Sequence, residues 1–133
     1  MCGSSGWHAA SLLDISYHTL SDTGAIDIEK FEANYLNQLG LIDEIEPRYR
    51  STYFTHIVGG YESGYYSYLW SAVLDNDAYE AFRENGIFDQ ETADSFRENI
   101  LAKSGTSDHE QLYRDFRGKD PSVEALLKNR GLK

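Results

Sequence analysis

Six of the ten tyrosines of this sequence lie between positions 49 and 68, together with one histidine and three glycines. A tyrosine hydroxyl, whose ordinary pKa is about 10, keeps its proton at neutral pH and can donate a hydrogen bond to a carbonyl that becomes an oxyanion. An imidazole can do the same or bind a carboxylate. The segment can therefore stabilise negative charge on a bound ligand. Its candidate donors are His56, Tyr49, Tyr53, Tyr61, Tyr65, Tyr66 and Tyr68.

The Gly59-Gly60 pair sets the expected geometry of this segment. Glycine adopts backbone angles closed to other residues, so we expect a tight turn or hinged loop, followed by a helix that begins near Tyr61 or Glu62. That helix would carry Tyr61, Tyr65 and Tyr68 on one face and an apolar group on the next. A hinged loop with these donors could close over an extended ligand. The apolar group comprises Tyr66, Leu69, Trp70 and Val73.

The same pattern has a plainer interpretation. A tyrosine-rich helix after a Gly-Gly turn can be an amphipathic core element whose hydroxyls reach the surface. His56, taken alone, is equally compatible with a structural role.

Helical periodicity predicts the elements that must position this segment. One helix is expected over 7–20, ended by Ser21 to Gly24, and a second over 28–39, capped by Asp27 and ended by Gly40. A third is expected over 90–103 after the cap Asp89. Two more are expected where Ser107 and Glu110 have capping-box spacing and where Asp120-Pro121 precedes a run ended by Gly131. With no confident strand, the prediction is an all-α chain, undivided over 7–133 after a flexible leader at 1–6.

Composition excludes several classes of function. The sequence has 12 Lys and Arg against 22 Asp and Glu, a net charge of −10, and lacks a basic patch, which argues against a nucleic-acid partner. It lacks the run of about 20 apolar residues that would span a membrane. One cysteine, Cys2, allows no internal disulfide, and the first residues lack the features of a signal peptide, so a cytoplasmic location is expected.

The tyrosine-rich segment carries a recognisable motif. The string His56-x-x-Gly59-Gly60-Tyr61-x-x-Gly64-Tyr65-Tyr66-x-Tyr68-Leu69-Trp70 resembles the substrate-binding segment of the zinc oligopeptidases related to thimet oligopeptidase. The bacterial peptidyl-dipeptidases and oligopeptidase A are the most similar members. Further similarity follows in the correct order along the chain, at Ala9 to Asp14, Pro47 to Ser51 and Phe116-Arg117-Gly118. The chain therefore resembles the C-terminal segment of these metallopeptidases.

The resemblance implies a fold and a set of roles. These enzymes are large, bilobed and helical, and they act on short peptides in a deep channel. By position, Tyr68 matches the tyrosine thought to donate to the tetrahedral oxyanion, and His56 is its expected catalytic neighbour. The implied substrate-binding residues are His56, Gly59, Gly60, Tyr61, Tyr65 and Tyr68.

The metal centre of the family has no counterpart in this sequence. The family holds zinc with an H-E-x-x-H helix and a later glutamate, whereas His109-Glu110 is followed by Tyr113 where the second histidine should stand. We therefore expect no metal ligand and no cofactor in this chain, with zinc belonging to the complete enzyme. The chain alone is expected to be inactive, and His8, His18 and His109 are interpreted as surface or structural residues.

A different class of function stays open. The chain could be a non-enzymatic helical module that binds peptides or proteins, such as a truncated relic. Expected partners are short peptides and either the missing N-terminal lobe or a second copy of the chain. Apolar residues that could mediate self-association are Trp7, Tyr66 and Trp70.

Overall fold

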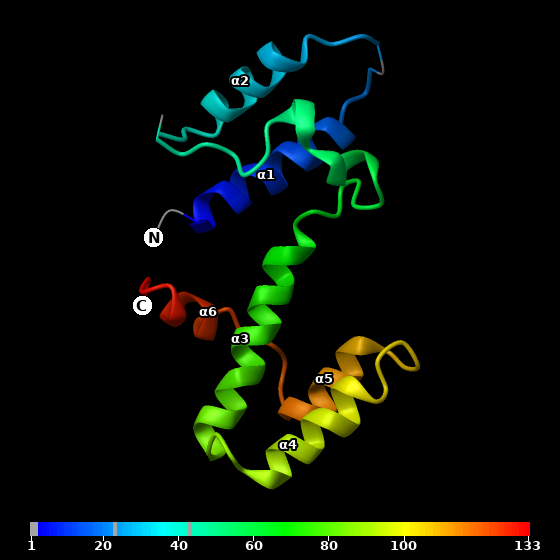
Figure 1. Cartoon of the computed structure of the whole chain (residues 1–133), viewed down its shortest axis with the longest axis vertical. Helices are drawn as coiled ribbons and strands as arrows, with labels where there is room; N and C mark the ends of the chain where they lie inside the picture. The colour runs from blue at the N-terminus through cyan, green and yellow to red at the C-terminus, as the bar shows by residue number, and fades with distance from the viewer. Residues whose placement is uncertain (1–2, 23, 43) are drawn as a thin grey trace. The chain divides into compact units, whose positions relative to one another are not determined.

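The computed structural model describes residues 3–22, 24–42 and 44–133, and these form helices and turns without a strand (Figure 1). This confirms the predicted all-α class. The chain divides into two compact units, Met1–Leu69 and Trp70–Lys133, where the sequence had suggested one undivided region over 7–133. The elements are α1 (Gly3–His18), α2 (Ile28–Gln38), η1 (Ser51–Tyr53), η2 (Thr55–Val58), α3 (Ser67–Asn85), α4 (Gln90–Phe96), η3 (Arg97–Leu101), α5 (His109–Arg117) and α6 (Glu124–Asn129).

The first unit packs its turns onto α1. Ala10, Phe54 and Tyr65 form the centre of a buried cluster, although Phe54 and Tyr65 come from segments with little helical structure. Four partly buried side chains surround the cluster: Trp7, Tyr49, Ile57 and Tyr68. Aromatic rings supply most of this core, and each large ring removes much apolar surface from water.

Two buried carboxylates hold these turns in place. Glu32 of α2 accepts hydrogen bonds from the backbone N–H and the hydroxyl of Ser51 at 2.7 and 2.6 Å, and it pairs with Arg50. Asp14 of α1 accepts the backbone N–H groups of Ser63 and Tyr65, each at 3.0 Å. The segment between α2 and α3 is therefore fixed near its middle, at Ser51, and near its end, at Ser63 and Tyr65.

The second unit packs α4 and α5 against part of α3. Phe82, Phe96 and Phe116 meet ring to ring, with centroid separations of 5.2 to 6.4 Å. Asp77 of α3 is buried, accepts the Tyr113 hydroxyl at 2.7 Å and lies 3.4 Å from the Arg117 guanidinium. A buried carboxylate with these partners avoids the cost of an uncompensated charge.

Several predicted caps are confirmed and others are wrong. Asp27 and Asp89 accept the N–H groups of Lys30 and Thr92, as expected for N-caps. The cap of α5 is Asp108, which accepts from Gln111, and not Ser107. The helix expected from Pro121 begins only at Glu124, and the Asp120 carboxylate that was expected to cap it pairs with Arg114.

The ends of two helices also differ from the prediction. The first helix ends at His18 and already includes Gly3–Gly6, which the sequence had placed in a leader; residues 1 and 2 lie outside the described residues. The helix expected from Tyr61 or Glu62 begins at Ser67, and residues 62–66 form turns. Ser63 has a φ of 57°, a left-handed conformation that is incompatible with a continuing helix.

Candidate functional site

The structure brings four of the seven candidate donors of the tyrosine-rich segment together. The His56 ring lies 5.7, 5.0 and 5.9 Å from the ring centroids of Tyr61, Tyr65 and Tyr68. Tyr61 stacks on Tyr68 at 5.3 Å, and Tyr65 lies 5.1 Å from Tyr68. We call these four residues the donor cluster. The sequence analysis had placed the three tyrosines on one face of a single helix, and this is not what the structure shows. Instead, η2, the turns that follow it and the start of α3 together bring the four side chains into contact.

The two glycines allow the chain to fold back beside His56. The N–H groups of Gly59 and Tyr61 both donate to the His56 carbonyl, at 3.3 and 3.2 Å. Gly60 has a φ of 106°, and a Cβ on Gly59 would lie 2.9 Å from the Thr55 carbonyl oxygen. Side chains at these two positions would therefore be strained or would clash. The turn places Tyr61 next to the imidazole.

The three tyrosines of the donor cluster have different environments. Tyr65 is 1% exposed and packs against Trp7 and Phe54, so burial raises its pKa to about 12. Tyr61 is 42% exposed, and Tyr68 is half-buried. The pKa of Tyr68 is raised, first by a hydrogen bond with the Tyr61 side chain and then by burial. Tyr61 and Tyr68 are therefore the phenols that a ligand at the surface could reach, whereas Tyr65 supports them from within the core.

His56 has one nitrogen without a partner. Its Nδ1 atom is buried and makes no hydrogen bond within the described part of the chain. A buried polar atom left unpaired costs free energy and therefore calls for an explanation. The surrounding rings of Tyr49 and Phe54, at 5.1 and 5.9 Å, fix the orientation of the imidazole.

Asp14 positions the cluster, although the sequence analysis gave it no role. Its side chain is fully buried, and its bonds to Ser63 and Tyr65 hold the turn that follows Tyr61 against α1. His18, expected to be a surface or structural residue, lies one helical turn further on, with Nδ1 3.0 Å from the Asp14 carboxylate. The signal in the sequence is a lone carboxylate flanked by Leu13 and Ile15 in this helix, which a buried hydrogen-bond partner would explain.

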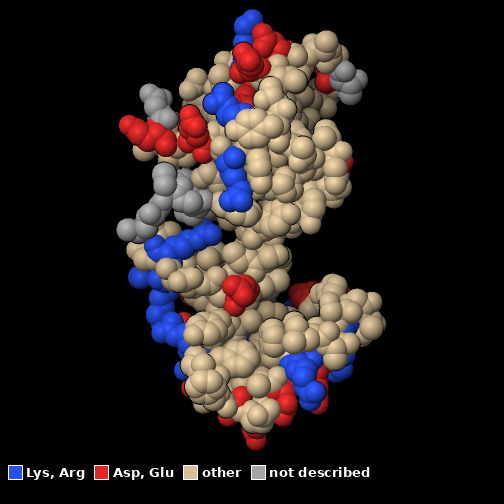
Figure 2. Space-filling model, in the orientation of Figure 1, with Lys and Arg blue, Asp and Glu red and all other residues tan. Residues whose placement is uncertain are grey.

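Trp7 and Arg48 border the cluster. The Arg48 guanidinium lies 4.1 Å from the centroid of the Trp7 ring, and Trp7 in turn lies 5.5 Å from Tyr68. Trp7 is thus partly covered within its own unit, whereas Tyr66 and Trp70 are 53% and 50% exposed. On the face shown in Figure 2, a broad surface of the first unit, over the turns between α2 and α3, is nearly free of charged side chains.

The residues that the structure describes do not fit the zinc of the family that the chain resembles. Within 3–22, 24–42 and 44–133, no three His, Cys, Asp or Glu side chains are grouped so as to hold a metal ion. Tyr113, at the position of the missing second histidine, is buried and donates its hydroxyl to Asp77. Tyr113 therefore belongs to the core of the second unit, whereas His109 and Glu110 are exposed.

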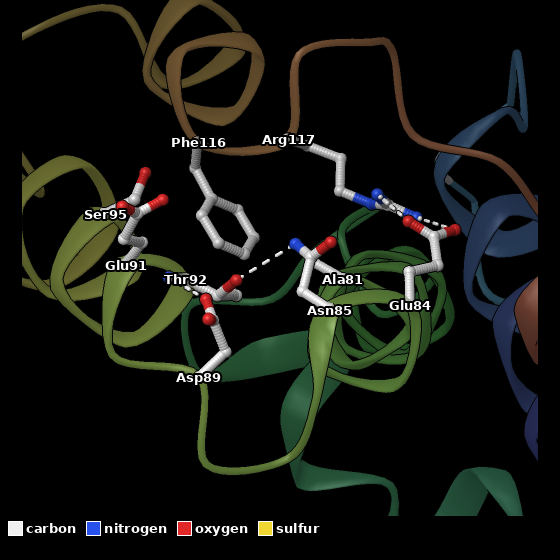
Figure 3. A pocket seen from close by; sticks show the side chains of 9 residues that line it. All are labelled: Ala81, Glu84, Asn85, Asp89, Glu91, Thr92, Ser95, Phe116 and Arg117. Atoms are coloured by element: carbon white, nitrogen blue, oxygen red, sulfur yellow. Dashed lines mark hydrogen bonds and ion pairs between the residues drawn. The ribbon is translucent and has the colours of Figure 1, made fainter.

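The second unit contains a polar cavity of about 560 Å³ (Figure 3). Its charged and polar groups largely pair with one another. Arg117 and Glu84 form two hydrogen bonds, at 2.7 and 2.9 Å, and the Asn85 amide donates to the Thr92 hydroxyl at 3.0 Å. Asp89 caps α4. These interactions explain the side chains as structural.

Comparison with known proteins decides the family. Residues 8–132 match the profile of Peptidase family M3. The chain belongs to this family. It is 43% identical to the dipeptidyl carboxypeptidase of Escherichia coli over 93% of its own length and 19% of that protein's length. It is also 48% identical to the oligopeptidase A of the same organism, over 60% of this chain and 12% of the relative.

The match to family M3 confirms the resemblance to the zinc oligopeptidases that the sequence analysis described. A plant relative, the probable cytosolic oligopeptidase A of Arabidopsis thaliana, is 45% identical over 59% of this chain and 12% of its own length. The chain thus spans about a fifth or less of the length of these peptidases. No helix within the described residues is long and apolar enough to cross a membrane.

Proposed function

We propose that this chain supplies the peptide-binding and oxyanion-stabilising part of an M3 metallopeptidase of the peptidyl-dipeptidase or oligopeptidase type, acting on short peptides. The observation that carries the proposal is the donor cluster, in which the rings of His56, Tyr61 and Tyr68 meet while Tyr61 stays 42% exposed. The names of the relatives, dipeptidyl carboxypeptidase and oligopeptidase A, support the class of substrate.

The cluster suits a carbonyl that gains negative charge. Tyr68 donates its hydroxyl to the oxyanion, and Tyr61, stacked on it, orients that hydroxyl. His56 contributes a second donor or contacts the peptide backbone. Gly59 and Gly60 let the peptide approach the main chain, and Tyr65 supports the other rings from the core. Preorganised donors of this kind stabilise developing charge without reorganising during the reaction.

The group that activates water must come from outside this chain. The family resemblance implies a zinc ion for that task, and the described residues do not fit it. The chain alone is therefore expected to bind peptides and not to hydrolyse them. Its expected location is the cytoplasm. Measurable zinc-dependent cleavage of a short peptide by the pure chain would contradict this.

Binding of a short peptide to the isolated chain tests the proposal. We expect saturable binding, detected by calorimetry, that weakens about fivefold in Tyr68→Phe, because one neutral hydrogen bond contributes about 1 kcal/mol. Tyr79→Phe is the matched control, since Tyr79 is 55% exposed on α3 within the second unit. If both variants bound the peptide with the same affinity as the unaltered chain, the donor cluster would not be the peptide-binding site.

A graft tests the catalytic part. This chain would replace the matching fifth of the E. coli dipeptidyl carboxypeptidase, and peptide hydrolysis would be measured. Tyr68→Phe in an active graft should lower kcat by roughly 100- to 1,000-fold, as for the loss of one oxyanion donor, while Tyr79→Phe leaves it unchanged. An active graft that is indifferent to Tyr68→Phe would refute the catalytic role.

The alternative is a helical module that binds proteins. The exposed side chain of Trp70, next to an apolar pocket with Leu74, Tyr113 and Pro121, favours it. Peptide binding that depends on Trp70 and not on Tyr68 would support this second function.

A further inference from the structure

Arg48 stands out by its charge environment. The first unit, residues 1–69, contains nine Asp and Glu but only three Lys and Arg. Lys30 pairs with Asp27 at 3.0 Å, and Arg50 pairs with Glu32 at 2.5 Å. Arg48 forms no ion pair with any carboxylate of residues 3–22, 24–42 or 44–133. Arg48 is therefore a positive charge in an acidic unit, and no carboxylate of the described residues forms an ion pair with it.

The position of Arg48 is nevertheless fixed. Its backbone N–H donates to the Gly6 carbonyl at 3.0 Å, and the preceding Pro47 is buried. Its guanidinium lies 4.1 Å from the centroid of the Trp7 ring and 5.6 Å from that of Tyr49. One donor of the guanidinium is used in a hydrogen bond with the Tyr49 side chain. Because the side chain is exposed and a guanidinium carries five N–H donors, the remaining donors stay open to a ligand. A cation held in this way loses little conformational freedom on binding.

Two aromatic rings, each in contact with Arg48, connect it to the donor cluster. Trp7 lies between Arg48 and Tyr68, with its ring 5.5 Å from Tyr68. Tyr49 lies between Arg48 and His56, with its ring 5.1 Å from His56. Because an extended peptide advances roughly 3.3–3.6 Å per residue, two or three residues suffice to span from the cluster to the guanidinium.

We propose that Arg48 binds the terminal carboxylate of a peptide whose backbone lies against the donor cluster. This inference rests on the proposed function and adds a requirement to it: the preferred ligand ends within a few residues of the carbonyl that faces Tyr68. A guanidinium is suited to this role because it stays charged at all relevant pH values and offers paired, coplanar donors to a carboxylate. The side chain is a specificity residue, since it contacts the ligand away from the reacting carbonyl.

Paired peptides provide the test. The same short sequence, without Asp or Glu, would be prepared with a free C-terminal carboxylate and with a C-terminal amide, and binding to the full chain measured by calorimetry. We expect the acid to bind about five- to tenfold more tightly than the amide, as for a charge-assisted bond at a partly open site. In Arg48→Gln the two forms should bind equally, and in Arg48→Lys part of the preference should remain.

Arg130→Gln is the matched control. Arg130 belongs to the second unit and likewise pairs with no described carboxylate, so its loss changes the net charge by the same amount. The control should keep the full preference for the acid. Circular dichroism would verify that each variant retains its helices.

The outcomes separate the two proposals. Equal binding of acid and amide by the unaltered chain, with affinity still dependent on Tyr68, would overturn the role of Arg48 alone. Absence of any peptide binding would overturn both proposals. An amide peptide that carries one Asp side chain and binds as tightly as the free acid would show that Arg48 selects side-chain carboxylates, which would also contradict a terminal-carboxylate site.

Discussion

Tyr65 and Tyr68 are three residues apart, yet they are suited to different tasks. Tyr65 is enclosed by Trp7, Phe54 and Tyr49, and burial raises its pKa to about 12. Tyr68 is half-buried and shares a hydrogen bond with Tyr61. Both phenols keep their protons at neutral pH, but only Tyr68 is accessible to a ligand. The same residue type therefore packs in the core at one position and keeps part of its ring in contact with solvent at the other.

The raised pKa of Tyr65 predicts a stability change at alkaline pH. Folding favours the neutral phenol, so this contribution is fully present below the unfolded pKa of about 10 and is lost as the pH rises through about 12. The free energy of unfolding of Tyr65→Phe should fall less steeply over that range than that of the unaltered chain. Urea denaturation at several alkaline pH values measures this difference.

Tyr66→Phe is the control for that measurement, since Tyr66 is 53% exposed. Its pH dependence should match that of the unaltered chain. Identical slopes for all three proteins would mean that Tyr65 titrates as an exposed phenol.

At the scale of elements, residues 62–66 illustrate how a tertiary contact overrides helical periodicity. The spacing of Tyr61, Tyr65 and Tyr68 is helical, but Asp14 takes up the N–H groups of Ser63 and Tyr65. Ser63 adopts a left-handed conformation in the resulting turn. The three rings still converge, because the turn folds Tyr61 back beside His56. The carboxylate on α1 thus decides the shape of an element nearly 50 residues away.

Asp14→Asn should destabilise the first unit by about 1–3 kcal/mol. The amide keeps a single acceptor oxygen, so either Ser63 or Tyr65 loses the partner of its buried N–H. Chemical denaturation followed by tyrosine and tryptophan fluorescence would report the change.

Asp75→Asn provides the matched control, since Asp75 is exposed on α3 and loses the same charge. It should change the free energy of unfolding by less than about 0.5 kcal/mol. A loss for Asp14→Asn no greater than for the control would show that the turn does not depend on this carboxylate.

At the scale of the whole molecule, two compact units share a chain that spans 19% of a related dipeptidyl carboxypeptidase. Each unit has its own core: aromatic rings around Tyr65 in the first, and the phenylalanines with the Asp77 network in the second. Trp70 stays half exposed beside an apolar pocket of the second unit. Apolar surface of this kind favours association with a further protein surface.

We therefore expect the isolated chain to self-associate, with its mean mass rising with concentration in light scattering. Trp70→Gln should shift the chain toward the monomer, because it removes a large apolar ring from the exposed surface. Tyr79→Gln, which alters a similarly exposed aromatic residue of α3, is the control and should leave the mass unchanged. A strictly monomeric unaltered chain would contradict the expectation and favour an independent module.

Local sequence patterns were sufficient to predict several features of this structure. Periodicity and capping residues predicted the helical class, the caps Asp27 and Asp89 and the turn at Gly59-Gly60, because these depend on neighbours within a few residues. Motif spacing indicated the members of the donor cluster and the M3 family. The roles assigned to His56 and Tyr68 stay predictions.

Contacts between distant segments decided the rest. The late start of α3, the core position of Tyr65 and the placement of Arg48 over Trp7 all depend on partners remote in sequence. Such partners cannot be read from periodicity, since a buried carboxylate such as Asp14 reveals its acceptor role only once the chain has brought distant N–H groups to it. Sequence by itself determined which residues could do chemistry, and tertiary structure decided which of them are exposed and which are buried, because burial and hydrogen-bond pairing are properties of the folded chain.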